Sequence, residues 1–333
     1  MSNLKAALIG LGAMGKNHAR VLKSLPGVDL VAVFDPATTP GSSELPIVSS
    51  LQELIEIKPD YCVIATPTYT HEEIAVQLME AGINIFIEKP ISMSTQSAER
   101  IILSSEKNRR VGAVGHIERF NAALVEAKRR INLGQIGDVY QISTRRLGPF
   151  PARITDVGVT VDLATHDIDL TKWLADSNYE SIAAQSTIRS GRNNEDLVSV
   201  VGKLKNGILV NHNVNWLSPL KERKTIITGE KGTFVADTLR SDLTFYENGS
   251  IINTQREIAH FKGVTQGETT IFAFDKPEAL YVEHLEFIKS LAGKKSESVT
   301  LQQASETVRV AEAIIDSSST GESIKLCIFA LLD

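Results

Sequence analysis

Residues 4–19 read LKAALIGLGAMGKNHA, and this stretch decides the fold. The apolar run 6–9 has the composition of a buried parallel strand. It leads directly into the spacing Gly10-x-Gly12-x-x-Gly15, which is followed by a helical pattern of apolar residues. The sequence therefore predicts a strand, a glycine turn and a helix in direct succession, as in a dinucleotide-binding unit.

Each glycine of this motif has its own physical role. Gly10 permits the tight turn from strand to helix, Gly12 lets the backbone approach a pyrophosphate, and Gly15 lets the helix pack closely on the strand. The helix that begins at Ala13 and Met14 directs free N–H groups and a positive dipole end at a bound anion. We therefore expect these five residues to contact the pyrophosphate of a cofactor.

An acidic residue completes the motif. A second apolar run, 28–34, ends at Asp35, which follows Gly15 by 20 residues. A carboxylate at about this offset accepts hydrogen bonds from the adenosine ribose hydroxyls. It also repels a 2′-phosphate, so the sequence favours NAD over NADP. A chance glycine turn with an unrelated surface aspartate is the weaker alternative.

Composition narrows the class of protein. The 333 residues suggest two domains, and 42% hydrophobic with 23% charged residues is typical of a globular chain. A net charge of −5 provides no basic face for nucleic acid or an anionic membrane. No apolar run approaches membrane-spanning length, and glycines interrupt the N-terminal run too early for a signal peptide. With only two cysteines, Cys62 and Cys327, we expect a cytoplasmic chain.

The order of elements predicts an α/β fold with two domains. Strands alternate with helices over residues 1–118, which indicates an NAD-binding Rossmann domain with a doubly wound parallel sheet. The Pro-, Gly- and Ser-rich segment 36–46 predicts an abbreviated first crossover. Over 119–333, successive strands and the hairpin signal Asn206-Gly207 predict an α+β domain with an open, largely antiparallel sheet for substrate binding and oligomerisation.

One face of that open sheet has no helix predicted to cover it. With Val, Ile and Trp216 in its strands, this face would be an apolar patch unless a partner covered it. We therefore expect a homodimer or homotetramer that uses this face.

Candidate site residues follow from the rule that ligands bind beyond the carboxyl ends of parallel strands. The rule selects Thr66-Pro67, Glu88-Lys89-Pro90 and His116. Lys89 matters most, because an ammonium at the end of a buried strand can donate to a substrate oxygen and stabilise a developing alkoxide. An ordinary surface lysine at a strand end is the alternative.

A second cluster lies in VDLATHDID, residues 161–169. Asp162 and His166 are four residues apart, so an α-helix would place them on one face. Histidine titrates near neutral pH, which suits a general base that removes a hydroxyl proton. A core or surface histidine remains an alternative. Zinc binding with Asp167 and Asp169 is another, but no further ligand shows a suitable spacing, so we expect no metal.

Three segments, GLGAMGKNHA, EKP and the DxxxH pair, together resemble the Gfo/Idh/MocA oxidoreductase family over nearly the whole chain. The resemblance implies NAD(P)-dependent oxidation or reduction at a CH–OH carbon of a sugar or cyclitol. It implies catalytic roles for Lys89 and His166, with Asp162 as the accompanying acid in the substrate site. The residues that it places beside the cofactor are Thr66, Pro67, His71 and Glu88.

Two further stretches, 115–121 and 145–170, are similar to family members that oxidise C3 of UDP-N-acetylglucosamine. Arginine suits bidentate contacts to phosphate, which independently supports an anionic substrate. The expected substrate contacts are His116, Arg119, Arg146 and Arg153, with Arg145 nearby. Some of these arginines could instead pair with Asp138, Asp156 or Glu118 as ordinary ion pairs.

Two other functions remain open at this stage. The chain could be a myo-inositol or free-sugar dehydrogenase, or a non-catalytic NAD-binding regulator on the same fold. The expected partner is a small sugar or nucleotide sugar, and no sequence feature favours nucleic acid or a membrane.

Overall fold

The computed structural model describes residues 3–41, 43–151, 157–249 and 264–326, and the chain divides into two compact units. Unit 1 comprises residues up to 117 together with 277–312, and unit 2 comprises 118–276 together with the residues from 313 onward. The expected domain boundary lies one residue from the first unit boundary. Residues 277–312, which we expected in the second domain, instead pack with unit 1, because helix α7 (Ala279–Leu291) buries aromatic and aliphatic side chains against its sheet.

Unit 1 is built on a six-stranded sheet with the order β14-β5-β4-β3-β1-β2. The strands are parallel except β14, which pairs with β5 in the antiparallel sense. The strands are β1 (Leu4–Ile9), β2 (Val28–Phe34), β3 (Tyr61–Ile64), β4 (Asn84–Glu88), β5 (Gly112–Gly115) and β14 (Val299–Thr300). This arrangement confirms the expected Rossmann fold.

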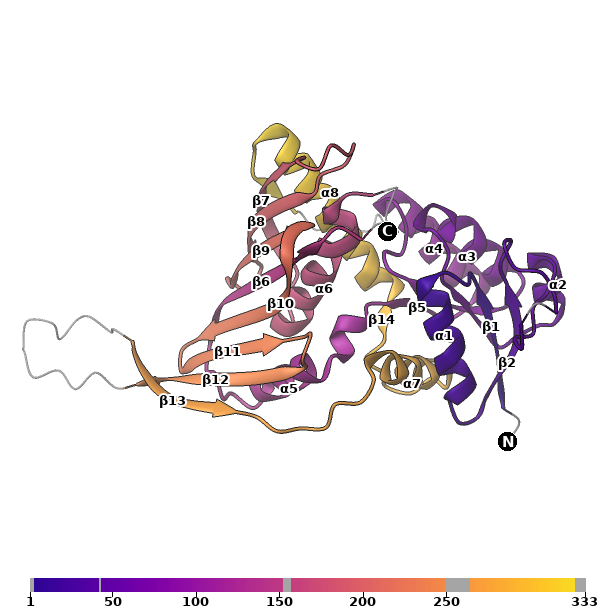
Figure 1. Ribbon diagram of the computed structural model, residues 1–333, viewed down its shortest axis with the longest axis horizontal. Helices are drawn as coiled ribbons and strands as arrows, with labels where there is room; N and C mark the ends of the chain where they lie inside the picture. The colour runs from indigo at the N-terminus through magenta and orange to yellow at the C-terminus, as the bar shows by residue number, and fades with distance from the viewer. Residues whose placement is uncertain (1–2, 42, 152–156, 250–263, 327–333) are drawn as a thin grey trace, which may run out of the picture. The chain divides into compact units, whose positions relative to one another are not determined.

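Helices cover both faces of this sheet, because successive residues of its strands point to opposite buried sides. On one face Ile9 and Ile64 pack against α3, α4 and the start of α8. On the other face Leu8 and Phe86 pack against α1 and α7. Both helices are labelled in the ribbon diagram (Figure 1). The helices are α1 (Ala13–Ser24), α2 (Leu51–Glu56), α3 (His71–Glu80), α4 (Thr95–Asn108), α7 (Ala279–Leu291) and α8 (Leu301–Thr320), with the 3-10 turn η1 (Thr68–Thr70) before α3. None of the helices among the described residues is long and apolar enough to cross a bilayer.

The first crossover is short, as the composition of residues 36–46 predicted. Ile47 forms an isolated parallel bridge with Val33, and α2 contains only six residues. The side chain of Ser50 caps α2 by accepting a hydrogen bond from the backbone N–H of Glu53 at 3.1 Å. The chain thus connects β2 to β3 with one and a half helical turns instead of a full crossover helix.

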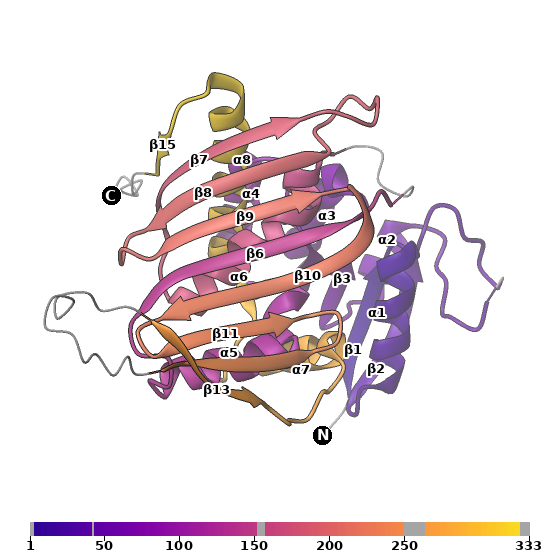
Figure 2. The same cartoon turned by 60° about the vertical axis from the view of Figure 1, so that its left-hand side comes forward.

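Unit 2 is built on a nine-stranded sheet with the order β13-β12-β11-β10-β6-β9-β8-β7-β15 (Figure 2). Neighbouring strands are antiparallel except β6 and β9, which confirms the largely antiparallel sheet. Helix α5 packs on β11 and β12, and α6 packs on β6. The elements are η2 (Ile117–Phe120), α5 (Ala122–Asn132), β6 (Val139–Pro149), η3 (Thr160–Ala164), α6 (Thr165–Ala175), β7 (Tyr179–Thr187), β8 (Leu197–Leu204), β9 (Leu209–Asn215), β10 (Leu217–Gly229), β11 (Gly232–Asp237), β12 (Asp242–Gly249), β13 (Thr265–Ile271) and β15 (Ile324–Lys325).

The turn between β8 and β9 is the hairpin that Asn206-Gly207 predicted. Gly207 has a φ of +89°, and the Leu204 N–H donates to the Ile208 carbonyl at 2.9 Å. The sequence did not predict β13, β14 or β15. Two of these strands have only two residues each, and β13 is polar and largely exposed, so none shows an apolar alternation.

The exposed face of the nine-stranded sheet is less apolar than expected. Trp216, which we expected on this face, is only 4% exposed. The face carries polar pairs such as Ser199, whose hydroxyl donates to the Asn213 side chain at 2.8 Å. Exposed aliphatic side chains remain on β8 and β9, where Val201 and Leu209 are 62% and 51% exposed.

A substitution of Phe287 in α7 can test whether this helix contributes to the core of unit 1. Its fully buried ring contacts the rings of Tyr61 and Phe86, with centroid distances of 5.4 and 5.3 Å. We expect Phe287→Ala to lower the free energy of unfolding by about 3–5 kcal/mol. Urea denaturation followed by circular dichroism measures this loss. The control Leu103→Ala, at an exposed position of α4, should change stability by no more than about 0.5 kcal/mol. Equal stability of the two variants would contradict the assignment of α7 to this core.

Candidate active site

The glycine turn after β1 has the geometry that its sequence predicted. Gly10 has a φ of +93°, and a Cβ there would lie 2.5 Å from the carbonyl oxygen of Ala65. A Cβ on Gly15 would collide with the carbonyl oxygen of Gly10. Both positions therefore require glycine, and the second sets how closely α1 approaches the end of β1.

Gly12 has a different role from the other two glycines. A Cβ built on it would meet no atom within 4 Å, so its backbone faces open space. Gly12 is also the N-cap of α1, and no side chain caps the helix there. The first-turn N–H groups at Ala13 and Met14 have no partner within the helix by its geometry, which leaves them available for an anion. This cradle fits a pyrophosphate.

Asp35 lies beside the glycine turn, immediately after β2. Its Oδ2 accepts a hydrogen bond from the Leu11 N–H at 2.7 Å, and its Oδ1 accepts one from the Ala37 N–H at 2.9 Å. These bonds fix the carboxylate between the turn and the following loop. A fixed carboxylate at this edge can accept hydrogen bonds from ribose hydroxyls, which is the role that the sequence predicts for Asp35.

The loops after β3 and β4 are joined by His71. Its Nε2 lies 3.0 Å from the Thr66 carbonyl oxygen, and its Nδ1 lies 3.0 Å from the Pro90 carbonyl oxygen. Burial lowers the pKa of His71, and its hydrogen bonds to these carbonyls partly oppose that shift. We expected His71 to contact the cofactor, but its ring is buried and occupied by the two loops. His71 therefore holds Thr66 and Pro67 in place relative to the residues after β4.

Lys89 and His116 follow the adjacent strands β4 and β5 in unit 1, as predicted. Lys89 is half-buried and His116 is buried. Glu88, which we expected beside the cofactor, is buried, and its carboxylate contacts His18 of α1. Its Oε1 lies 2.8 Å from His18 Nε2, and its Oε2 accepts the backbone N–H of Lys89 at 3.1 Å.

Asp162 and His166 lie in unit 2, on a turn that differs from the expected α-helix. Residues 160–164 form a π-helical turn, in which the Thr165 N–H bonds to the Thr160 carbonyl. The α-helix α6 starts only at Thr165. Asp162 is therefore on the wide turn and His166 on the first α-helical turn, with Asp162 buried and His166 half-buried. Such π turns occur often at functional sites.

Two residues that the sequence analysis missed hold this turn. The Glu195 carboxylate accepts the Thr160 N–H at 3.0 Å, and the Glu195 carbonyl accepts the Val159 N–H at 2.9 Å. A Cβ on Gly158 would collide with the Glu195 carboxylate. No local pattern could indicate this contact, because Glu195 comes from the loop before β8, far along the chain.

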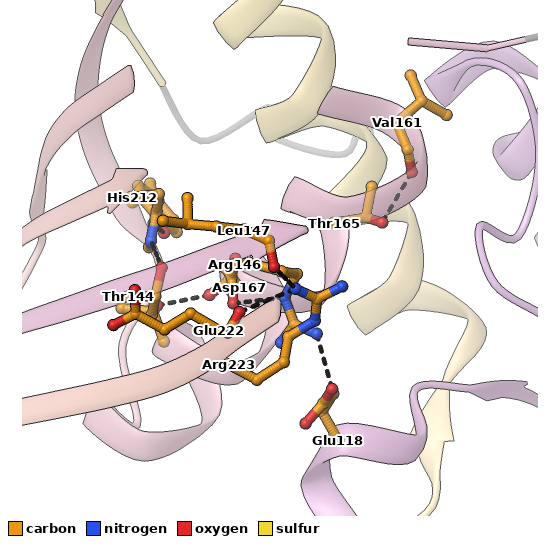
Figure 3. A network of polar contacts seen from close by, with 12 residues as sticks. Glu118, Thr144, Arg146, Leu147, Val161, Thr165, Asp167, His212, Glu222 and Arg223 are labelled. Carbon is orange, nitrogen blue, oxygen red and sulfur yellow. Dashed lines mark hydrogen bonds and ion pairs between the residues drawn. The ribbon is translucent and has the colours of Figure 1, made fainter. Parts of the chain in front are cut away.

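The arginines Arg119 and Arg146 have partners that differ from the predicted phosphate. Arg119 makes a buried two-pronged bond to Asp169, at 2.7 and 2.6 Å. Arg146 donates to Glu118 at 2.7 Å and to Asp167 at 3.0 Å (Figure 3). Burial acts against the charge on Arg146, but the two carboxylates outweigh it and raise the pKa of Arg146. Both side chains thus hold carboxylates inside unit 2, and the pair of Arg146 with Glu118 is one of the ion pairs that the sequence analysis kept as an alternative to phosphate contacts.

Among the other arginines, Arg145 is exposed and pairs with Glu222 at 3.1 Å, and Arg153 lies outside the described residues. Arg223 of β10, beside Arg146, escaped the sequence analysis. Its Nη1 donates to the Leu147 carbonyl at 2.6 Å and to the Glu222 carbonyl. Burial and the charge of Arg146 lower the pKa of Arg223, while Asp167, Glu118 and Asp162 act in the opposite direction. Arg223 is therefore within electrostatic range of the Asp162 carboxylate.

Among residues 3–41, 43–151, 157–249 and 264–326, no three His, Cys, Asp or Glu side chains form a group that could hold a metal ion. The two acids that could have joined Asp162 and His166, Asp167 and Asp169, are held by Arg146 and Arg119.

Curated relatives include a nucleotide-sugar dehydrogenase and an inositol dehydrogenase. The chain is 28% identical over 258 residues to UDP-N-acetylglucosamine 3-dehydrogenase of Acidithiobacillus ferrooxidans, a match that covers 75% of this chain and 79% of that protein. It is 32% identical over 200 residues to the scyllo-inositol 2-dehydrogenase (NAD(+)) of Bacillus subtilis, covering 56% of this chain and 58% of that protein. The second match thus spans less than two thirds of the relative's length.

Solved structures share the fold over nearly the whole chain. UDP-N-acetylglucosamine 3-dehydrogenase GnnA from Acidithiobacillus ferrooxidans has a TM-score of 0.82 at 23% identity, with 96% of this chain and 99% of that chain covered. The WlbA dehydrogenase from Bordetella pertussis, solved in complex with NADH and UDP-GlcNAcA, has a TM-score of 0.79 at 21% identity, with 98% and 99% covered. At these identities the likeness shows a common fold.

Family models match both parts of the chain. Residues 4–116 match the oxidoreductase family's NAD-binding Rossmann fold, and residues 128–326 match its C-terminal α/β domain. The first match agrees with the anion cradle at Gly12 and the carboxylate of Asp35. Unit 1 is therefore an NAD-binding Rossmann unit, and the chain belongs to the Gfo/Idh/MocA oxidoreductase family.

Proposed function

We propose that this protein is an NAD-dependent dehydrogenase that oxidises a secondary alcohol of a nucleotide sugar in the cytoplasm, with UDP-N-acetylglucosamine and its C3 carbon as the first candidate. The observation that carries the proposal is the combination of a half-buried Lys89 at a strand end of an NAD-binding unit with Asp162 and His166 on two consecutive helical turns of unit 2. The relative that matches over three quarters of the chain carries this activity in its name.

In the proposed chemistry, residues of both units act on the substrate. NAD supplies the hydride acceptor. His166 removes the proton from the reacting hydroxyl, a role that imidazole suits because its ordinary pKa is the closest to neutral pH among the side chains. Lys89 donates a hydrogen bond to the same oxygen and stabilises its developing negative charge. Asp162 orients the sugar or the imidazole ring.

Arg223 is our candidate for the anionic part of the substrate. Arg119 and Arg146 are buried and hold carboxylates, so they are poor candidates for phosphate. Within the described part of the chain, Arg223 donates its hydrogen bonds through Nη1, which leaves Nε and Nη2 for a ligand. Arginine can present these two donors to one phosphate or carboxylate.

The second candidate function is a polyol dehydrogenase. The similarity to an inositol dehydrogenase of Bacillus subtilis favours it. An uncharged polyol has no anionic group to pair with the Arg223 guanidinium, so the charge of the substrate distinguishes the two candidates.

Turnover with defined substrates tests the proposal. We expect NADH formation, followed at 340 nm, with UDP-N-acetylglucosamine, and a kcat/KM at least about tenfold higher than with myo-inositol or free N-acetylglucosamine, as the loss of a charged contact implies. A preference for myo-inositol would favour the polyol alternative. NAD binding without turnover on any of these compounds would favour a non-catalytic regulator.

Lys89→Met is the matched variant for this assay. It retains side-chain length but has no donor, so we expect kcat to fall by about 10²–10³-fold while the Kd for NAD remains within a few-fold. Lys107→Met, at an exposed position of α4, should leave both values unchanged. Full activity of Lys89→Met would contradict the proposed role of Lys89 in stabilising the reacting oxygen.

The choice of cofactor depends on Asp35. Asp35→Ser removes the carboxylate that accepts from ribose and repels a 2′-phosphate, so we expect the ratio of NAD to NADP affinity to fall roughly tenfold or more. Cofactor fluorescence titration measures both Kd values. Asp29→Ser, at the opposite end of β2, serves as the control with an unchanged ratio. An unchanged ratio in Asp35→Ser would contradict this discrimination by charge.

We also propose that the exposed face of the nine-stranded sheet pairs with a second copy of this chain. Val201 of β8 and Leu209 of β9 are exposed aliphatic side chains at diagonal positions of this strand pair, among polar groups that can bond across an interface. Light scattering should give the mass of a dimer or tetramer, and Val201→Lys should shift it towards the monomer. A wild-type monomer would contradict the pairing.

A further inference from the structure

Three buried polar side chains in unit 1 take no part in the chemistry described above. His18 Nε2 lies 2.8 Å from Glu88 Oε1, and His18 Nδ1 lies 2.9 Å from His284 Nε2. Both imidazoles are fully buried, and Glu88 is 8% exposed. The three side chains form one hydrogen-bonded line, which we call the His–His–Glu line.

The line connects three elements that are distant in the sequence. His18 is on α1, one turn after Gly15, Glu88 ends β4, and His284 is on α7. The ring of Phe86 stacks on His284 with a centroid distance of 5.3 Å and meets the His18 ring edge at 5.8 Å. The imidazoles are thus fixed by an aromatic contact as well as by hydrogen bonds.

One assignment of protons satisfies this geometry best. Among the described residues His284 Nδ1 has no hydrogen-bond partner, and a buried N–H without an acceptor is costly. We therefore place the His284 proton on Nε2, where it donates to His18 Nδ1. His18 then carries its proton on Nε2 and donates to Glu88. Burial acts to raise the pKa of Glu88, but the His18 hydrogen bond and the Lys89 charge outweigh it and lower the pKa of Glu88.

The line ends at the backbone of Lys89. Glu88 accepts from His18 through Oε1 and from the Lys89 N–H through Oε2, at 3.1 Å. A rotation of the Glu88 carboxylate would break one of these bonds, so the His18 donor also fixes the carboxylate plane that holds the Lys89 amide. The opposite side of the loop is held by His71, which bonds to the Pro90 carbonyl.

Stability alone does not require this arrangement. Burying a carboxylate costs free energy, and apolar side chains of similar volume often stabilise a core equally well or better. Orienting a neighbouring functional group is what a fixed buried carboxylate can do and an apolar side chain cannot.

We propose that His18 is a positioning residue for Lys89, which acts through the Glu88 carboxylate, and that His284 holds the His18 ring for this purpose. The proposal rests on the proposed function, in which Lys89 touches the reacting oxygen. It couples α1, whose first turn forms the anion cradle, to the strand end that carries the lysine.

Two substitutions of His18 distinguish a role in positioning Lys89 from a role in core packing alone. His18→Gln places an amide N–H near the former Nε2 and can still donate to Glu88, whereas His18→Asn reaches only the Nδ1 position and can bond only to His284. Because each variant retains one of the two bonds, we expect similar losses of thermal stability. We expect His18→Asn to lower kcat by about 10–100-fold at a nearly unchanged Kd for NAD, and His18→Gln to recover most of that loss.

A second readout needs no substrate. Reductive methylation of lysines, quantified by mass spectrometry, reports how accessible the Lys89 amine is. We expect His18→Asn to raise the modification rate of Lys89 several-fold, His18→Gln to resemble the wild type, and exposed Lys107 to react equally in all three proteins.

These outcomes distinguish the two proposals. Equal kcat values and equal Lys89 modification rates in both variants, with reduced stability, would show that His18 only packs and would overturn the positioning role. A wild type without turnover on any sugar would contradict the proposed function, while the Lys89 modification rates would still decide the positioning role.

Discussion

The rest of unit 1 depends on the contact between Gly15 and the carbonyl of Gly10. Because no side chain fits between them, α1 starts directly on the end of β1. That placement points the first turn of α1 at the open space beside Gly12 and brings His18, one turn later, against the end of β4. One steric constraint thus positions both the anion cradle and the side chain that holds Glu88.

In unit 2 the site residues are positioned by buried ion pairs, whereas in unit 1 they are positioned by close backbone packing. The stretch around His166 contains three aspartates, and two of them are neutralised by buried arginines, Asp167 by Arg146 and Asp169 by Arg119. Breaking such a buried pair would leave an uncompensated charge, so these arginines stabilise the helix that carries His166. Asp162 is set apart from them by the π turn, which Glu195 holds at its start.

The fold was predictable from local patterns, and much of the site was not. The GxGxxG turn, the parallel strands and the Asn206-Gly207 hairpin depend on residues that are close in sequence. The partners of Arg119, Arg146 and Glu88 come from other elements, and sequence spacing cannot show which arginine meets a carboxylate of the same chain. The sequence also could not show that residues 277–312 pack with unit 1, because this contact joins segments that are far apart in the chain. The sequence therefore indicated candidate site residues, but it could not show which carboxylates and imidazoles of the same chain they contact.

The central claim is that Lys89 of unit 1 and His166 of unit 2 act on one oxygen of the substrate. The most direct test is a double-mutant cycle that measures kcat for Lys89→Met, His166→Asn and the double variant with the best substrate. Groups that act in one step are not additive, so the double variant should lose no more than about as much as the worse single variant. Losses that multiply fully in the double variant would show independent roles and contradict the account.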